Sequence, residues 1–421
     1  MNGMVKKFKT VRPSQKKCFL IFFLTAFAVH LFLPLNWGDD SIFNAEAVVG
    51  IDEFLKGSSR LLTDSMTYIF CRWHILWRLI NPVTLTVLVK VLHELIPAKS
   101  RRLSFTILCT ALVYPTMIIV DAGFIATTVN YLWPITFAAI NLLVFQQLYK
   151  EKQFKPAYLL SIPLLFYALN MEMMSAVLCF TFVTGCAVMI YNKRLHPFAV
   201  VQSLISAVGL LVAYFGNLNG DNSRMIREIG RYFPDYESLN ILNKIELGFS
   251  STFYCMTMKL SFASIAFIAF TVFLVFTVFK VSKNIILRIS ALFPCFFAVV
   301  FSVISVTPFK NSDFITFFTG GMQNYKMNKA VYSFEPIPDI IFVLLALCIL
   351  ITIAFLLKDK IEVIKAYLIL GVGLGTRLIM GFSPTVWASG YRTFAVFIIT
   401  MIIVAVMIAD RYYNKINKTE S

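Results

Sequence analysis

Charged residues are scarce in this sequence. Only 14% of its 421 residues are Asp, Glu, Lys or Arg, whereas 58% are hydrophobic, and the mean hydropathy is +0.76. A soluble domain needs a polar surface, and neither end of the chain has a stretch of that composition. The shortage of charge therefore predicts one integral membrane domain that covers residues 1–421.

Cysteine and histidine are too few and too scattered to indicate a metal or disulfide site. The eight cysteines include no Cys-x-x-Cys pair, and most lie within apolar runs. We interpret them as small residues of a membrane core. The four histidines lack the spacing of metal ligands, which disfavours zinc. No internal repeat is evident either, which disfavours the inverted-repeat transporter folds.

Basic residues outnumber acidic ones, 38 to 22, and give a formal net charge of +16. Such a charge could indicate a nucleic-acid partner. However, the lysines and arginines cluster in short loops and tails on one side of the predicted spans, which is the positive-inside pattern of membrane proteins. No basic stripe with interleaved aromatics projects from a soluble surface, so we predict no nucleic-acid partner.

Apolar runs recur along the whole chain, each of roughly 18 to 22 residues, which is enough to cross a bilayer core of about 30 Å as a helix. We therefore predict an all-α fold, a polytopic transmembrane bundle of about twelve spans. The predicted spans lie near residues 18–36, 74–97, 103–120, 130–149, 156–170, 173–191, 197–216, 257–279, 289–308, 337–357, 362–381 and 392–409.

The distribution of charge predicts the topology. The basic tail, residues 1–17, precedes an apolar run that no small-x-small cleavage site follows, so we expect an uncleaved first helix with a cytoplasmic N-terminus. Counting forward makes every cytoplasmic loop short and basic, and leaves both termini in the cytoplasm. Three longer segments are then extracytoplasmic loops, namely 36–73, 217–256 and 309–336.

The first outer loop carries two adjacent carboxylates, Asp39 and Asp40, directly after the first span. Charges are costly near lipid, so they usually have a task. Apolar residues then recur every three to four positions across 41–56, which predicts an amphipathic helix along the membrane surface. The two aspartates could form part of a site, could cap this helix, or could do both.

Other polar residues of chemical interest fall on the same predicted side: Arg60, Asn130, Trp133, Glu172, Asn217, Arg224, Arg377 and Arg392. Carboxylates can act as a general base or bind a divalent metal such as Mg²⁺ or Mn²⁺, for which Asp39 and Asp40 are the candidates. Arginines suit phosphate, because a planar guanidinium donates two hydrogen bonds at once.

Each of these residues also has a structural interpretation. The stretch 130–134 could be an interfacial aromatic anchor. Glu172 could be a hydrogen-bonded structural carboxylate, and Arg224 could belong to a solvated helix face. Arg377 and Arg392 could extend from helix ends to the membrane interface.

The order of these motifs resembles a bacterial family of integral membrane proteins of uncharacterised function, which is itself similar to the GT-C glycosyltransferases. The resemblance covers the chain to about residue 230. It rests on Gly38-Asp39-Asp40, Ser58-Ser59-Arg60, Asn130-Tyr131-Leu132-Trp133-Pro134, Glu172, and Gly216-Asn217 with Arg224.

The resemblance implies a plasma-membrane enzyme that takes a sugar from a polyprenyl-phosphate donor on the extracytoplasmic face. Asp39 and Asp40 match the acidic motif of the first outer loop in GT-C enzymes, and Arg60 matches a later basic position. Many GT-C enzymes carry a soluble C-terminal domain, and this sequence ends soon after its twelfth predicted span. Recognition of a cell-surface glycan or glycolipid acceptor would then depend on loops 217–256 and 309–336.

We assign the remaining residues by inference. Glu172 would support catalysis, Arg60, Arg224 and Arg392 would hold the donor phosphate, and Asn130, Trp133 and Asn217 would contact substrate. Two alternatives remain open. The first is a transporter or flippase of lipid-linked glycans, for which Lys90 is the clearest intramembrane charge. The second is a glycan polymerase that acts at the same face.

The predicted topology can be tested by labelling intact cells with an impermeant thiol reagent. Ser238→Cys should gain labelling over the parent protein, whereas Thr419→Cys should not, because only the first would face outward. The reverse pattern would place the acidic motif in the cytoplasm.

Overall fold

A computed structural model describes residues 15–46, 50–55, 58, 60–96, 108, 122–151, 154–219, 223–319 and 330–419. Within these ranges the chain is helical and has no strand. The predicted all-α class is therefore confirmed.

The described helices can be grouped into three parts of the chain. The first part contains α1 (Gln15–Phe32), α2 (Asp39–Glu46), α3 (Ile51–Phe54), α4 (Leu61–Arg72) and α5 (His74–Leu95). The middle part contains α7 (Phe124–Thr127), the π-helix η2 (Thr128–Leu132), α8 (Trp133–Glu151), the 3₁₀ turn η3 (Pro156–Leu160), α9 (Ser161–Ala168), α10 (Glu172–Tyr191) and α11 (Pro197–Asn219). The last part contains α12 (Ser223–Tyr232), η4 (Tyr236–Ser238), α13 (Ile241–Thr257), α14 (Phe262–Val281), α15 (Ile285–Ile304), η5 (Pro308–Asn311), α16 (Asp313–Thr319), α17 (Pro336–Leu357), α18 (Lys360–Met380), η7 (Tyr391–Phe394) and α19 (Ala395–Thr419).

Nine helical segments of the described chain are long and apolar enough to cross a membrane. They lie at Gln15–Phe32, His74–Leu95, Phe124–Lys150, Glu172–Tyr191, Phe262–Val281, Ile285–Ile304, Pro336–Leu357, Lys360–Met380 and Tyr391–Tyr412. Two further predicted spans correspond to shorter apolar helices, Pro156–Ala168 and Pro197–Ala213. The predicted span 103–120 lies outside the described residues, apart from 108. The protein is thus a polytopic helical membrane protein.

Short polar side chains determine where several of these helices begin. Ser261 and Ser264 form a reciprocal capping box at the start of α14. The Asn284 side chain accepts hydrogen bonds from the first free backbone amides of α15, and the Asp359 side chain accepts them from those of α18. Such caps satisfy amides that have no partner within the helix.

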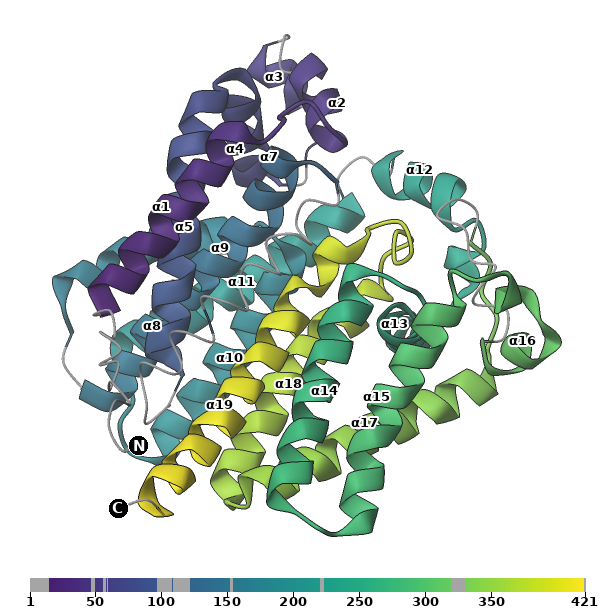
Figure 1. The fold of residues 1–421 in the computed structure, drawn as a ribbon. Coiled ribbons are helices and arrows are strands. Elements are labelled where there is room, and N and C mark those ends of the chain that lie inside the picture. Colours follow the sequence, from purple (N-terminus) through teal and green to yellow (C-terminus); the bar gives the residue numbers. More distant parts are fainter. Residues whose placement is uncertain are drawn as a thin grey trace, which may run out of the picture.

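The two ends of the bundle differ in character (Figure 1). α1 begins and α19 ends at one end, whereas α2, α3, α4 and α7 gather at the opposite end. α12 also lies toward that opposite end. The short helices that follow the first span therefore form a cap over one end of the long helices.

The sequence predicted one continuous surface helix over 41–56, and this prediction is wrong. The structure has two short helices, α2 and α3, and Gly50 before α3 is extended, with φ −66° and ψ 155°. Glycine is a poor helix former, so a break at this position is favoured. The ring of Phe54 lies 5.9 Å from that of Phe43 and 5.2 Å from that of Tyr68, which holds α3 against α2 and α4.

The segment 217–256, predicted as an extracytoplasmic loop, has secondary structure of its own. Most of the segment is helical, in α12 and α13, and the second half of α13 is buried on nearly all sides, from Leu247 to Thr257. Figure 1 shows α13 end-on, whereas α14 and α15 beside it are seen along their length. The predicted loop 309–336 likewise contains η5 and α16.

Glycines allow α13 to approach the end of α18 closely. A Cβ atom at Gly248 would lie 2.6 Å from the Leu378 carbonyl oxygen, and one at Gly381 would lie 1.8 Å from the Lys244 carbonyl oxygen. The Tyr236 hydroxyl donates to the Gly381 carbonyl at 3.0 Å. The contact is therefore backbone against backbone, with no room for a larger residue.

This packing predicts that Gly248→Ala lowers stability by about 1–3 kcal/mol, because the added methyl group meets rigid backbone. The matched control is Gly375→Ala on α18, where a Cβ atom would meet nothing within 4 Å. That control should be neutral or stabilising by up to about 1 kcal/mol, since Ala is the better helix former. Thermal unfolding in detergent measures both, and equal midpoints would contradict the proposed contact.

Candidate functional site

Asp40 is a buried carboxylate that ties the first loop to α7. Its Oδ2 accepts from the Ile125 amide at 3.0 Å, and its Oδ1 accepts from the Ala126 amide at 2.8 Å. The side chain is completely buried. Asp40 therefore caps α7, which lies more than 80 residues further along the chain. The sequence had suggested instead that it caps the surface helix predicted over 41–56. Burial raises the pKa of Asp40, amide hydrogen bonds from Ala126, Ile125 and Phe124 oppose the rise, and Asp39 adds to it.

Two glycines permit this cap. Gly38 and Gly123 have φ values of +58° and +114°, a region that favours glycine. A Cβ atom at Gly123 would lie 2.7 Å from Asp40 Oδ1 and 2.8 Å from the Asp40 backbone nitrogen. The Gly38-Asp39-Asp40 sequence thus suits the turn before α7 in two ways: glycine leaves room for the close approach, and the Asp40 carboxylate accepts the free amides.

Asp39 points elsewhere and forms an ion pair with Arg392. Arg392 Nη1 lies 3.0 Å from Asp39 Oδ2, and the side chains are 20% and 42% exposed, respectively. The guanidinium of Arg392 also lies over the ring of Tyr131, 5.5 Å from its centroid. Among the described residues, no acceptor bonds the buried Arg392 Nε. The pair therefore combines an accessible carboxylate with a guanidinium that has a free donor.

Arg60 and Glu172 form a second ion pair of fork-to-fork geometry. Arg60 Nε donates to Glu172 Oε1 at 3.1 Å, and Nη2 donates to Oε2 at 2.7 Å. The Ser58 hydroxyl supports this position, since it accepts from the Arg60 backbone amide and donates to Asp64. Burial alone would lower the pKa of Arg60, but Glu172, Tyr131 and Asp64 outweigh it, so the pKa is raised.

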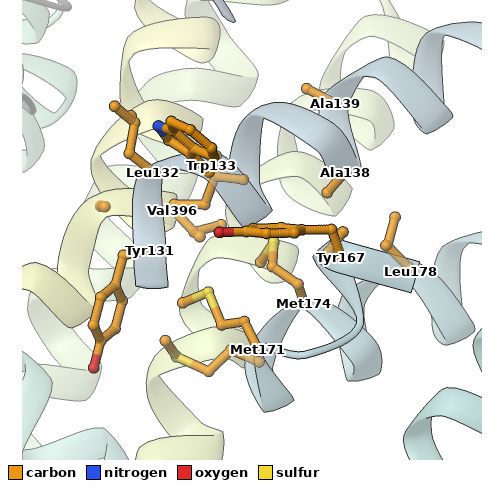
Figure 2. Packing of buried hydrophobic residues seen from close by; sticks show 14 of the residues in the cluster. Tyr131, Leu132, Trp133, Ala138, Ala139, Tyr167, Met171, Met174, Leu178 and Val396 are labelled. Carbon is orange, nitrogen blue, oxygen red and sulfur yellow. The ribbon is translucent and has the colours of Figure 1, made fainter. Parts of the chain in front are cut away.

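Tyr131 lies where these charges converge. It interacts electrostatically with Arg60, Arg377 and Arg392, which come from three separate parts of the chain. Figure 2 shows its ring directed away from the neighbouring residues Trp133 and Tyr167. The sequence suggested an aromatic anchor or a substrate contact for the stretch 130–134, but not this convergence, because Tyr131 is 71 to 261 residues away from the three arginines.

Arg377 is buried rather than extended to the membrane interface, so that interpretation is wrong. Its Nε donates to Thr252 Oγ1 at 3.2 Å, and its Nη1 donates to the Thr393 hydroxyl. Its guanidinium lies 3.9 Å from the centroid of the Phe394 ring. Within the described part of the chain it forms no ion pair, so it contributes a positive charge beside Tyr131.

Asn130 and Trp133 are buried side chains with hydrogen-bond partners inside the protein. Asn130 Nδ2 donates to Thr67 Oγ1 and to the Ala126 carbonyl, at 3.2 and 2.9 Å. Trp133 Nε1 donates to Asn81 Oδ1 at 2.9 Å, and its ring belongs to the buried cluster of Figure 2. Both side chains thus have structural partners in the fold, and their predicted contact with substrate stays a prediction.

Two predicted site residues lie where the structure describes only the backbone. Asn217 belongs to the last turn of α11, and Arg224 belongs to the first turn of α12. Their predicted contacts with substrate stay predictions.

The donors around Asp39 do not fit a divalent metal. Both oxygens of Asp40 accept backbone amides, and one oxygen of Asp39 accepts from Arg392. Across the ranges that the structure describes, no three His, Cys, Asp or Glu residues come together as a possible metal site. An Mg²⁺ or Mn²⁺ ion would usually need several carboxylate or carbonyl oxygens.

No protein-family model matches the chain, and comparisons with curated proteins and with solved structures found no similar protein. The function is therefore inferred from the chemistry of the site.

The cap predicts that Asp40→Ala lowers stability by about 1–3 kcal/mol, because two buried amides lose their acceptor. Since the folded state raises the pKa of Asp40, the folded state binds this proton more tightly than the unfolded state does. The stability contributed by Asp40 therefore falls as the pH rises through the raised pKa. The loss of stability in Asp40→Ala, relative to the parent protein, should accordingly be largest at acidic pH.

The control is Asp52→Ala, a change at an exposed residue of α3, which should shift stability by less than about 0.5 kcal/mol. Thermal unfolding of both variants across pH measures the difference. A loss for Asp40→Ala no larger than for Asp52→Ala would show that the cap contributes nothing.

Proposed function

We propose that the protein is a GT-C-like glycosyltransferase. It transfers a sugar from a polyprenyl-phosphate-linked donor to a cell-surface glycan or glycolipid at the extracytoplasmic face of the bacterial plasma membrane. The observation that supports this most directly is the accessible Asp39 carboxylate held by Arg392, with Arg60 close enough to interact with both Tyr131 and Arg392. A proton acceptor and two guanidiniums are thus grouped at one end of an apolar bundle.

The arginines supply the donor-binding part of this proposal. A guanidinium recognises phosphate oxygens by paired hydrogen bonds. Arg392 has a buried Nε with no acceptor among the described residues, and a phosphate oxygen could satisfy it. A prenyl chain would lie in the bilayer and bring its phosphate to the helix ends, where both ion pairs lie. The location and the chemistry of the arginines thus favour a lipid-linked phosphate.

The proposed reaction follows from the partners of each group. The acceptor hydroxyl oxygen bonds to the anomeric carbon, and its proton passes to Asp39. The bond between that carbon and the phosphate oxygen breaks, and its electron pair leaves with the prenyl phosphate. Arg60 and Arg392 stabilise the negative charge that develops on the leaving phosphate.

The hydrogen-bond partners of the three carboxylates, Asp39, Asp40 and Glu172, support a different role for each of them. Asp39 keeps one oxygen free of the bonds described above, so it is the proposed base. Both oxygens of Glu172 bond Arg60, so Glu172 positions this arginine and does not take the proton. Asp40 holds the loop through its two amide bonds and has no free oxygen for catalysis.

The flippase alternative has less support. Its strongest residue, Lys90 on α5, is exposed rather than buried among the helices. The paired charges of Asp39, Arg60, Glu172 and Arg392 belong to the first loop and to helix starts, not to the middle of the spans. A glycan polymerase would share this end of the bundle and the same general chemistry.

The proposal predicts that Asp39→Asn reduces sugar transfer by about 100- to 10,000-fold, the usual effect of losing a general base. Asparagine keeps an oxygen that can accept from Arg392, so the fold should be retained. Transfer by purified protein from a polyprenyl-phosphate sugar is measured beside Asp52→Asn, a conservative change at an exposed residue, which should behave as the parent does. Near-normal transfer by Asp39→Asn would refute the role of Asp39 as base.

A further inference from the structure

The segment between α15 and α17 exposes several aromatic rings. It comprises η5 and α16, and its phenylalanines Phe309, Phe314 and Phe317 are 72%, 68% and 58% exposed. A contiguous apolar patch is uncommon on a surface that faces water, and it usually marks an interaction site. The question is which partner covers these rings.

The opposite side of the same segment is fixed to the bundle. Ile315 is buried, and the Phe318 ring packs edge-on against Phe301 of α15, with centroids 5.7 Å apart. The exposed rings therefore point outward from a segment that is docked, and they are not displayed by a free loop.

The surroundings identify lipid as the partner. At the end of α15, Val303 and Val306 are exposed, and so are Ile337 and Ile340 at the start of α17. α15 and α17 are candidate membrane spans, so exposed apolar side chains on them face lipid. Figure 1 shows α16 at the outer edge of the bundle beside these helices. The aromatic patch thus continues a surface that already faces the bilayer.

Polar residues are placed as an interfacial segment requires. Lys310 and Asp313 are exposed between the phenylalanines, so headgroups and water can solvate them while the rings enter the acyl region.

The contacts of this segment also show at which end of the bundle it lies. Just before α17, the Ala330 amide donates to the Tyr232 carbonyl at 2.7 Å, at the end of α12. α12 lies toward the end of the bundle that carries α2 with Asp39 (Figure 1). The start of α17, and α16 before it, therefore lie at the end that carries Asp39.

We propose that residues 308–317 anchor the protein in the phospholipid leaflet at the end of the bundle that carries Asp39, with the three phenylalanine rings inserted below the headgroups. This anchor does not depend on whether the protein transfers sugars. It would set the depth of the adjoining helix ends relative to the membrane surface.

The test places a photoreactive residue in the full-length protein in phospholipid vesicles. Phe317→p-benzoylphenylalanine keeps the aromatic ring, so folding is preserved. Illumination should give a lipid adduct as abundant as at Phe296, an exposed position on α15, and several-fold more abundant than at Ile315 on the buried side of α16. Mass spectrometry identifies the adducts.

Two results would overturn the proposal. A crosslinked dimer in place of the lipid adduct would show that a second copy of the chain covers the patch. A lipid yield at Phe317 no higher than at Ile315, while Phe296 still gives its adduct, would show that the rings do not contact lipid.

Discussion

The contact between Asp40 and the first amides of α7 fixes the geometry of the candidate site. It joins the loop after the first span to a short helix that runs directly into η2, which carries Tyr131. Because Asp39 is the preceding residue, the same contact holds its carboxylate beside Arg392. Gly38 and Gly123 make this approach possible, since neither position has room for a side chain. One buried carboxylate thus controls the position of an exposed one.

The charges at this end of the bundle are arranged so that most are neutralised locally. Asp39 pairs with Arg392, and Glu172 pairs with Arg60, which reduces the cost of placing charge near lipid. Arg377 has hydroxyl partners and an aromatic face in the described part of the chain, and it forms no ion pair there. Hydroxyl groups and a ring thus hold Arg377, whereas carboxylates hold Arg60 and Arg392.

The sequence predicted the helical membrane fold well because hydropathy and span length are local properties. Each of the nine candidate spans coincides with a predicted one, although the ends differ by a few residues. The errors have physical causes. α13 is amphipathic and rich in small residues, so its apolar signal is weaker than that of a lipid-facing span. The break at Gly50 is a local backbone preference that the hydrophobic period concealed.

The candidate site was predictable in its residue types but not in its pairing. The sequence indicated Asp39, Asp40, Arg60, Glu172 and Arg392 as polar groups on one side of the membrane. It could not show that Asp40 bonds α7, or that Glu172 uses both oxygens on Arg60, because 112 residues separate the members of that pair. The burial of Trp133 was also not predictable, because an aromatic residue near a span end can face either lipid or the core.

The Asp39–Arg392 pair spans 353 residues of sequence, which has a consequence for biosynthesis. A ribosome that adds roughly 5–20 residues per second needs roughly 20–70 s between these two codons. Throughout that interval Asp39 has no Arg392 to pair with, and every shorter nascent chain lacks the pair. The arrangement of the ion pair thus makes arrival of the last membrane helix the step that completes the site.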